Sequence, residues 1–315
     1  VAGNCAILKP SEIAGLSCMF LGKLAQDVGI PEGVFNIVTG DRETGAALVA
    51  SPSVSMVSFT GSSLTGSKIM EASAPKLSQV ALELGGKSAM VIFEDTDIER
   101  AVEATIKGCL TNGGQICTAH TRLIVQEGIK DDLLKRMKNV LEKIPYCKDP
   151  ITEKERGDRA WETGMTDVIQ PVVSASQHEK IVGFLNEAKA AGIEIYTGGE
   201  VPDPADLENS GGYFIQPTIL TNVPSDSDAW QKEIFGPVLS VRTFSSEAEA
   251  IKEANSTAFG LASTVMSSDP AKAMRVANRI RAGAVFATST GEGLLAEHPA
   301  VSRGGFAVSY THLRA

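Results

Sequence analysis

Cys117 is the residue in this sequence best placed to act as a nucleophile. It follows the run Asn112 to Ile116, whose paired glycines favour a break between two elements. Backbone N–H groups are free at such a junction, and a side chain there can face a cleft. Most free cysteines are nevertheless buried and inert, because reactivity needs a stabilised thiolate. The spacing alone therefore leaves two interpretations open, a buried thiol and a thiol nucleophile.

Glu83 supplies a carboxylate that could act as a general base for water. The run Val80 to Leu84 alternates apolar and polar residues as a strand does, and the pair Gly85 and Gly86 ends it. Glu83 therefore points away from its apolar neighbours. A carboxylate at a strand end is usually a solvated charge, but near a cleft it could take a proton from a water molecule.

Two further stretches are suited to binding a nucleotide. Gly61 to Gly66 joins a strand to a helix N-terminus, where backbone N–H groups and the helix dipole favour an anion. It is not a P-loop, because Lys68 comes one position late and Ile69 follows it instead of serine or threonine. Lys9 and Glu12 lie at a strand-to-helix junction, where they form either a solvated ion pair or a ribose site.

The elements that would position these residues alternate between strands and helices. Strands are predicted at 6–8, 35–38, 56–59, 80–84, 122–125, 213–215, 219–220, 239–244, 263–266 and 284–286. Helices are predicted at 13–28 with Ser11 as N-cap, and at 43–50, 63–74, 98–109, 129–144, 181–188, 248–255 and 270–281. This alternation implies parallel sheets covered by helices.

Composition excludes several classes of protein. The chain has 315 residues, which is enough for two domains, and a net charge of −9, which argues against a nucleic-acid partner. No apolar run approaches the roughly 20 residues of a membrane-spanning helix, so no membrane partner is expected. The five cysteines form no CxxC pair and no cluster with the four histidines. No metal site is therefore predicted, and a reducing, cytoplasmic location is expected.

Five motifs, in order along the chain, resemble the aldehyde dehydrogenase family. They are Leu8 to Glu12, Ser58 to Ser62, Leu82 to Lys87 (Leu-Glu-Leu-Gly-Gly-Lys), Gly114 to Ala119 (Gly-Gln-Ile-Cys-Thr-Ala) and Glu233 to Val238. The interval between Glu83 and Cys117 is also similar to that of the family. The runs Thr243 to Ile251 and Val265 to Asp269 look most like betaine and amino-aldehyde dehydrogenases.

The resemblance implies an α/β fold with an incomplete Rossmann-type parallel sheet domain and an α/β catalytic domain. The expected bounds are 1–85 for a partial dinucleotide-binding domain that lacks its N-terminal part, 86–286 for the catalytic domain, and 287–315 for a degraded tail. Val1 opens close to a strand, and Ser309 to Ala315 resembles translated sequencing-adapter readthrough. Both ends are therefore expected to be artefacts of a fragmentary gene, with a non-native end from about residue 307.

The activity that the resemblance implies is oxidation of an aldehyde to a carboxylate with hydride transfer to NAD. Cys117 would attack the aldehyde to form a thiohemiacetal and then a thioester, and Glu83 would activate the hydrolytic water. The implied cofactor-binding residues are Lys9, Ser11, Glu12, Gly61, Ser62, Thr65, Gly66, Leu84, Gly85, Glu233 and Phe235. Because the Glu12 carboxylate would repel a 2′-phosphate, NAD is expected rather than NADP. A small aldehyde is the expected partner, and the full-length parent is expected to be a homo-oligomer.

Departures from the family pattern keep alternatives in view. Thr288 stands where family members commonly carry an asparagine, and the family's oxyanion-donating asparagine belongs to an earlier segment that Asn112 does not replace. The chain itself is therefore expected to be inactive. A coenzyme A-acylating enzyme would commonly lack Glu83, and a thiol-dependent esterase would need a base such as His120. A non-catalytic structural descendant would be expected to have lost Cys117 or Glu83.

Overall fold

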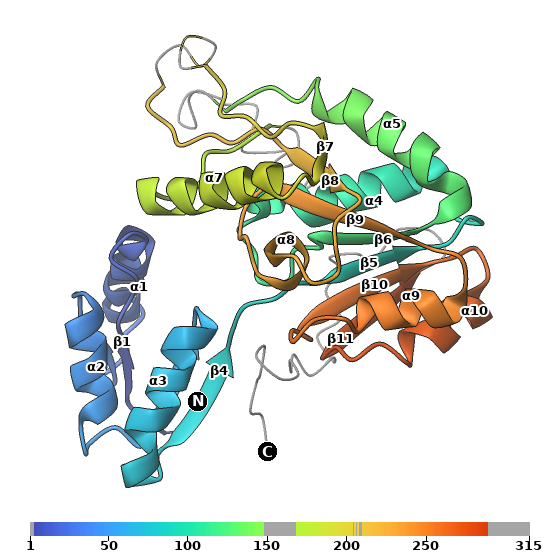
Figure 1. Cartoon of the computed structure of the whole chain (residues 1–315). Helices are drawn as coiled ribbons and strands as arrows, with labels where there is room; N and C mark the ends of the chain where they lie inside the picture. The colour runs from blue at the N-terminus through green and yellow to red at the C-terminus, as the bar shows by residue number, and fades with distance from the viewer. Residues whose placement is uncertain (1–2, 148–167, 204, 206, 208–209, 289–315) are drawn as a thin grey trace. The chain divides into compact units, whose positions relative to one another are not determined.

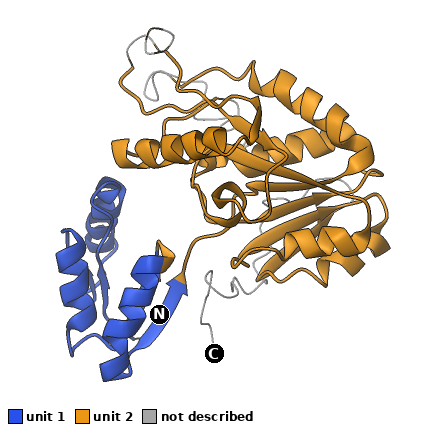
Figure 2. Ribbon diagram, viewed as in Figure 1, with its two compact units in different colours: residues 1–60, 64–82 blue, residues 61–63, 83–315 orange. Residues whose placement is uncertain are grey.

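The computed structural model describes residues 3–147, 168–203, 205, 207 and 210–288 (Figure 1). The chain divides into two compact units (Figure 2), one formed by residues 1–60 and 64–82 and the other by residues 61–63 and 83–315. In both units strands alternate with helices, and most strand pairs are parallel. The predicted α/β fold class is confirmed.

The first unit is built on two two-stranded sheets. β1 (Ala6–Leu8) pairs in parallel with β2 (Phe35–Ile37), and β3 (Met56–Thr60) pairs with β4 (Gln79–Glu83). The helices that follow the first three strands are α1 (Gly15–Asp27), α2 (Arg42–Ala50) and α3 (Ser63–Ser73). The prediction of Ser11 as N-cap is wrong: α1 begins at Gly15 after Ala14, and no side chain caps it. The Ser11 carbonyl instead accepts the Ala14 N–H in a turn that precedes the helix.

The apolar stripe of α1 is exposed within the described chain. No residue of α1 is buried, and the side chains of Leu16 and Phe20 are 91% and 64% exposed. An amphipathic helix buries its stripe only where another apolar surface meets it. In α2 and α3 the buried apolar side chains are Val49 and Ile69. The first unit therefore has a small core and an apolar surface that no other described residue of the same unit covers.

A seven-stranded sheet organises the second unit, in the order β11-β10-β5-β6-β9-β8-β7. These strands are β5 (Ala89–Ile92), β6 (Arg122–Gln126), β7 (Glu194–Thr197), β8 (Thr218–Thr221), β9 (Val238–Phe244), β10 (Ala262–Met266) and β11 (Ala284–Thr288). All neighbouring pairs are parallel except β7 and β8, which are antiparallel. The central strands β5 and β6 are buried on both faces, as parallel strands covered by helices must be.

Two layers of helices cover this sheet (Figure 1). The helices are α4 (Ile98–Leu110), α5 (Lys130–Leu141), α7 (Ala175–Ala190), α8 (Asp228–Gln231), α9 (Glu247–Ala254) and α10 (Pro270–Ala277). Met90 and Ile92 of β5 lie in one core cluster with residues of α4 and α5. Ala89 and Val91 lie in another with residues of the other four helices. Alternate residues of one strand thus face opposite layers, which follows from the twofold period of a strand.

The structure differs from the predicted elements in several places. β5 and β7 were not predicted, because a short apolar run such as 89–92 lacks the alternation that identifies a strand. The predicted strand at 213–215 is absent, and Tyr213 makes only an isolated bridge with Val172. α10 ends at Ala277 rather than at residue 281. Of the predicted tail at 287–315, residues 287 and 288 instead complete β11, and residues 289–315 lie outside the described residues. None of the described helices combines the length and apolar character needed to cross a membrane.

Candidate active site

A sharp backbone turn between α4 and β6 presents Cys117. α4 begins at its N-cap Asp97, whose carboxylate accepts the Arg100 N–H, and ends at Leu110. The next residues, Asn112, Gly113 and Gly114, have left-handed φ values of 55°, 63° and 72°. Glycine adopts this conformation without strain, so the predicted break at the glycine pair is confirmed. Cys117 follows, half-buried, five residues before β6 starts.

Gly86 lies directly against the backbone of Cys117. A Cβ atom placed on Gly86 would overlap the Cys117 carbonyl oxygen and contact Leu261. No other residue fits there without moving the cysteine loop. Gly86 follows β4 by three residues, so this contact holds the segment that begins at Glu83 next to the cysteine. The two residues predicted to be catalytic are therefore carried by segments that touch.

Glu233 is held by the same pair of glycines. The Gly86 N–H donates a hydrogen bond to Glu233 Oε1 at 2.9 Å, and a Cβ on Gly85 would lie 2.5 Å from Oε2. A Cβ on Gly114 would likewise overlap the Gly236 carbonyl. Three segments, carrying Glu83, Cys117 and Glu233, thus meet pairwise through glycine contacts.

Phe235 has an unusual backbone conformation that a neighbouring side chain supports. Its φ of 59° is rare for a bulky residue, and such a conformation costs on the order of 1–3 kcal/mol. Gln177 at the start of α7 donates hydrogen bonds from Nε2 to the carbonyls of Ile234 and Phe235, at 3.1 and 2.8 Å. Sequence reasoning missed Gln177, since a glutamine in an amphipathic helix carries no signal of its own.

The electrostatics of the site oppose a thiolate on Cys117 in the free chain. Burial raises the pKa of the Cys117 thiol, and the negative charges of Glu233 and Glu83 raise it further. The backbone N–H groups of Thr118 and Cys117 have the opposite effect on that pKa, because they stabilise negative charge on the sulfur. Both carboxylates therefore disfavour the thiolate of Cys117, and the two backbone N–H groups favour it.

Burial also raises the pKa of Glu233. The Gly86 N–H and the positive charges of Lys180 and Lys87 work against that rise in pKa. Lys87 is itself 1% exposed, and within the described chain its Nζ has no hydrogen-bond partner. Burial lowers the pKa of Lys87 to about 7. A lysine after two glycines suggests a solvated charge, so no local pattern predicts this buried amine.

The predicted nucleotide residues are divided between the two units. In the first unit, Lys9 Nζ donates to the Gly40 carbonyl at 2.6 Å and lies 3.8 Å from the Glu12 carboxylate, so these two side chains are brought together. Ser11 is exposed beside them. Thr65 and Gly66 belong to the first turn of α3, where Gly66 is buried.

The remaining predicted residues belong to the second unit. The Gly61 N–H donates to the Glu83 carbonyl at 3.0 Å, which ties the loop of Gly61 and Ser62 to the end of β4. Leu84 is buried, and Gly85 contacts Glu233 as described above. The second unit therefore holds both predicted catalytic residues together with Glu233 and Phe235.

His120 is engaged elsewhere. Its Nε2 lies 2.9 Å from the Thr264 hydroxyl of β10, and its side chain is buried. Burial lowers the pKa of His120 to about 4, so the ring is neutral at pH 7. The charges that act on the Cys117 thiol come from Glu233 and Glu83 and not from this histidine. The geometry gives His120 no part in activating the thiol. No cluster of metal-ligating side chains is found in the described ranges.

The reactivity of Cys117 gives a first testable prediction. Replacing Glu233 by glutamine removes a negative charge that opposes the thiolate, so the pKa of Cys117 should fall and its alkylation at pH 8 should accelerate, by about threefold or more. The rate is measured by mass spectrometry of the Cys117 peptide after timed exposure to iodoacetamide. Glu247→Gln, which removes a distant surface charge, is the control and should leave the rate unchanged. An unchanged rate in Glu233→Gln would contradict the assigned proximity.

Comparison with known proteins adds independent information. The sequence profile described as the aldehyde dehydrogenase family matches residues 1–312. Aminoaldehyde dehydrogenase 2 of Pisum sativum, described as peroxisomal, is 46% identical over 286 residues, which cover 90% of this chain and 54% of that protein. Betaine aldehyde dehydrogenase of Beta vulgaris, described as chloroplastic, is 43% identical over 286 residues, which cover 90% of this chain and 54% of that protein. The chain thus spans about half the length of the curated relatives it matches.

Solved structures show the same similarity. Betaine aldehyde dehydrogenase from Staphylococcus aureus in complex with NAD+ superimposes with a TM-score of 0.85 at 34% identity, covering 97% of this chain and 57% of that one. An NAD-dependent aldehyde dehydrogenase from Sinorhizobium meliloti superimposes with a TM-score of 0.86 at 35% identity, covering 97% and 56%. The arrangement of elements described above is therefore one that these enzymes share.

Proposed function

Because this chain belongs to the aldehyde dehydrogenase family, we propose that the whole protein oxidises an aldehyde to a carboxylate with NAD as hydride acceptor. The observation that carries the proposal is the meeting of three segments at Gly86. This glycine contacts the Cys117 carbonyl and donates its N–H to Glu233, and Glu83 lies three residues before it. These contacts support the proposal that Cys117 is the nucleophile, Glu83 the general base and Glu233 a cofactor-binding carboxylate of one site.

The proposed chemistry uses the residues in two stages. Cys117 as thiolate attacks the aldehyde carbon, and the backbone N–H groups at the sulfur stabilise the negative charge that forms next to it. Loss of a hydride from the thiohemiacetal carbon, for which bound NAD would supply the acceptor, leaves a thioester on Cys117. Glu83 then takes a proton from the water that hydrolyses the thioester, and the carboxylate product leaves Cys117 free.

Two features of the site support binding of the nicotinamide end of a dinucleotide. Gly85 and Gly86 are buried, and because neither has a side chain, their backbone lies directly against Glu233 and the Cys117 carbonyl. The Gly86 N–H holds the Glu233 carboxylate, which can accept hydrogen bonds from ribose hydroxyls. Phe235 follows two residues later, with a left-handed backbone that Gln177 supports. Lys9, Ser11 and Glu12 would serve the adenosine ribose, and the loop from Gly61 through Thr65 to Gly66 the pyrophosphate.

An aminoaldehyde or betaine aldehyde is the substrate class that the similarities favour. The relatives quoted above carry those names, at 46% and 43% identity. The decisive experiment is NADH absorbance with the whole protein, NAD and 3-aminopropanal or betaine aldehyde. Hydrolysis of p-nitrophenyl acetate without cofactor is the comparison. Ester hydrolysis without NADH formation with any aldehyde would favour a thiol-dependent esterase instead.

The proposal extends to location and assembly. We keep the cytoplasm as the proposed location, although relatives are described as peroxisomal and chloroplastic, and fractionation of the native protein would test it. The family resemblance also favours a homo-oligomer for the whole protein, which light scattering would measure.

Cofactor preference should follow from Glu12. The Glu12 carboxylate lies next to Lys9. This carboxylate can accept hydrogen bonds from two ribose hydroxyls, and its negative charge repels a 2′-phosphate. We expect kcat/KM to be higher with NAD than with NADP in the whole protein, by about tenfold or more, a difference of about 1.4 kcal/mol. Glu12→Gln should reduce the preference, while Glu32→Gln on the same unit should not. A wild-type preference for NADP would contradict the proposed role.

The chain of 315 residues should itself show little dehydrogenase activity. The first unit, which carries Lys9 and Glu12, has few buried apolar side chains and leaves the stripe of α1 exposed. A half-site on so small a core is not held rigidly, and poor positioning costs about 10²-fold in rate or more. Assaying this chain beside the whole protein, with NAD and several aldehydes, tests this. Equal turnover in the two samples would show that the first unit is sufficiently ordered.

A further inference from the structure

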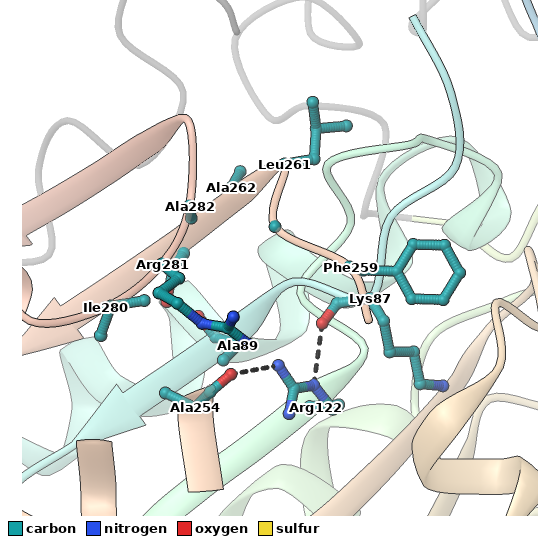
Figure 3. Close-up of a pocket in the computed structure, with 12 residues that line it drawn as sticks. Lys87, Ala89, Arg122, Ala254, Phe259, Leu261, Ala262, Ile280, Arg281 and Ala282 are labelled. Carbon is teal, nitrogen blue, oxygen red and sulfur yellow. Dashed lines mark hydrogen bonds between the residues drawn. The ribbon is translucent and has the colours of Figure 1, made fainter. Parts of the chain in front are cut away.

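A buried arginine lies behind the candidate active site. Arg122 is 2% exposed and begins β6, five residues after Cys117. Figure 3 shows its guanidinium bonded to the carbonyls of Lys87 and Ala254, both at 2.8 Å. It also donates to the Glu253 carbonyl at 2.9 Å. The Glu253 and Ala254 carbonyls are at the C-terminal end of α9, where the helix dipole favours a positive charge.

The pocket drawn in Figure 3 beside this arginine does not explain it. Its cavity volume is about 10 Å³, which is room for about one water molecule. Most of its lining residues are of apolar types, and they include neither Cys117 nor Glu233. The guanidinium is used instead for bonds between segments of the protein.

Trp230 connects the arginine to the segment that carries Glu233. The indole is completely buried, and its Nε1 donates to the Ser256 hydroxyl at 2.8 Å. The guanidinium carbon of Arg122 lies 5.0 Å from the ring centroid, and that of Arg242 lies 5.4 Å from it. Both distances are within the range of a cation–π interaction. Arg242 in turn pairs with the Glu253 carboxylate at 2.8 Å.

These contacts connect the three segments of the site through residues that are close in sequence to Cys117, Gly86 and Glu233. Arg122 is on the strand that follows Cys117, the Lys87 carbonyl is next to Gly86, and Trp230 precedes Glu233 by three residues. We propose that Arg122 and Trp230 are positioning residues that fix the Glu233 carboxylate relative to the Cys117 thiol. Among the described residues, neither side chain hydrogen-bonds Cys117, Glu83 or Glu233. They act through Gly86 and through the short segment from α8 to Glu233.

The positioning role of Arg122 and Trp230 matters for catalysis only if the proposed function holds, and so rests on it. It can nevertheless be tested without measuring turnover. Glu233 opposes the thiolate of Cys117 only while its carboxylate is held nearby. Loss of the indole should let the segment after α8 move, so Cys117 should be alkylated faster at pH 8. Trp230→Leu should raise that rate by about threefold. Glu233→Gln, in which the charge is removed altogether, sets the scale.

A matched control separates positioning from general stability. Phe244 is 1% exposed, ends β9, and packs edge-on against Phe93 at 5.0 Å. Phe244→Leu also removes a buried aromatic ring, but Phe244 pairs with Gln126 at the end of β6, four residues along that strand from Arg122. Both leucine variants should lower the urea midpoint of the 315-residue chain, and alkylation is measured where each remains folded. The alkylation rate should change in Trp230→Leu and stay at the wild-type value in Phe244→Leu.

Conservative variants keep the test decisive if Trp230→Leu does not fold. Trp230→Phe retains a ring beside both guanidinium groups and should keep the wild-type alkylation rate. Arg122→Lys retains the charge but cannot bond the Lys87 and α9 carbonyls together, and should raise the rate. Equal rates in Arg122→Lys and wild type, or equal rates in the two leucine variants, would overturn the inference.

The proposed function can fail separately. In that case the whole protein would form no NADH, while the alkylation rates would still differ as expected. If both proposals hold, the whole protein with Trp230→Leu should show a KM for NAD raised by about tenfold, and Phe244→Leu should not.

Discussion

Replacing Cys117 by alanine is expected to abolish aldehyde oxidation in the whole protein, lowering kcat by about 10³-fold or more, while NAD binding changes little. Covalent capture is needed because a hydrated aldehyde is a poor hydride donor compared with an anionic thiohemiacetal. Of the other thiols, Cys109 and Cys147 are buried, and Cys5 and Cys18 belong to the first unit. The contacts of Gly86 with the Cys117 carbonyl and with Glu233 involve backbone and carboxylate atoms, so the alanine variant should keep the position of the Glu233 carboxylate, which is proposed to bind the cofactor.

Cys109 provides the matched control for this experiment. It lies in the same stretch of chain, at the end of α4, but it is buried, and burial raises the pKa of its thiol to about 12. A thiol with that pKa is not a thiolate at neutral pH, so Cys109→Ala should retain activity apart from a loss of stability. NADH absorbance measures turnover, and fluorescence titration measures NAD binding. Turnover in Cys117→Ala, with loss in Cys109→Ala, would assign the nucleophile to the other cysteine.

The positions of the two predicted catalytic residues could be read from local sequence. Asn112 to Gly114 is a break that only a left-handed backbone satisfies, and the alternation from Val80 to Leu84 ends at two glycines. Both signals are local, because they depend on neighbours along the chain. They correctly place Cys117 after a helix and Glu83 at the end of a strand. The family motifs then paired the two segments, which the contact of Gly86 with Cys117 brings together.

What the sequence could not show is long-range contact and burial. Lys87 and Arg122 look like ordinary surface charges, yet both are completely covered, and one bonds the backbone of the other. Their burial depends on α9 and Trp230, more than 100 positions away, so no local pattern announces it. The apolar stripe of α1 shows the opposite case, because a stripe of this kind is expected to be buried and here it is exposed. Its spacing correctly predicts a helix, but periodicity says nothing about whether a partner surface is present.

Replacing Glu83 by glutamine should separate the two chemical stages of the proposed reaction. Hydride transfer comes before hydrolysis, so a variant without the general base should release about one NADH per site in a burst and then turn over slowly. The steady-state rate should fall by about 10²-fold or more, the usual contribution of a general base. Glutamine preserves the size of the side chain, and the Glu83 carbonyl that accepts the Gly61 N–H belongs to the backbone.

The same substitution has a second effect, which should make the burst no slower. Glu83 is half-buried, and its charge is one of the two that raise the pKa of Cys117. Removing that charge lowers the pKa of the thiol, so the fraction of thiolate at pH 7 rises and the attack on the aldehyde is not impaired. Stopped-flow absorbance over the first turnover, at several pH values, measures the amplitude and rate of the burst.

Glu233→Gln is the contrasting variant for this experiment. It removes the other charge that acts on Cys117 but leaves Glu83 in place, so hydrolysis should be unaffected. Because Glu233 is held by the Gly86 N–H at the proposed nicotinamide ribose site, its loss should weaken NAD binding and slow the burst itself. Two carboxylates that influence one thiol would then be distinguished by the stage that each serves. Equal loss of burst and steady-state turnover in Glu83→Gln would mean that Glu83 acts before hydride transfer, and the assignment of this residue to hydrolysis would be wrong.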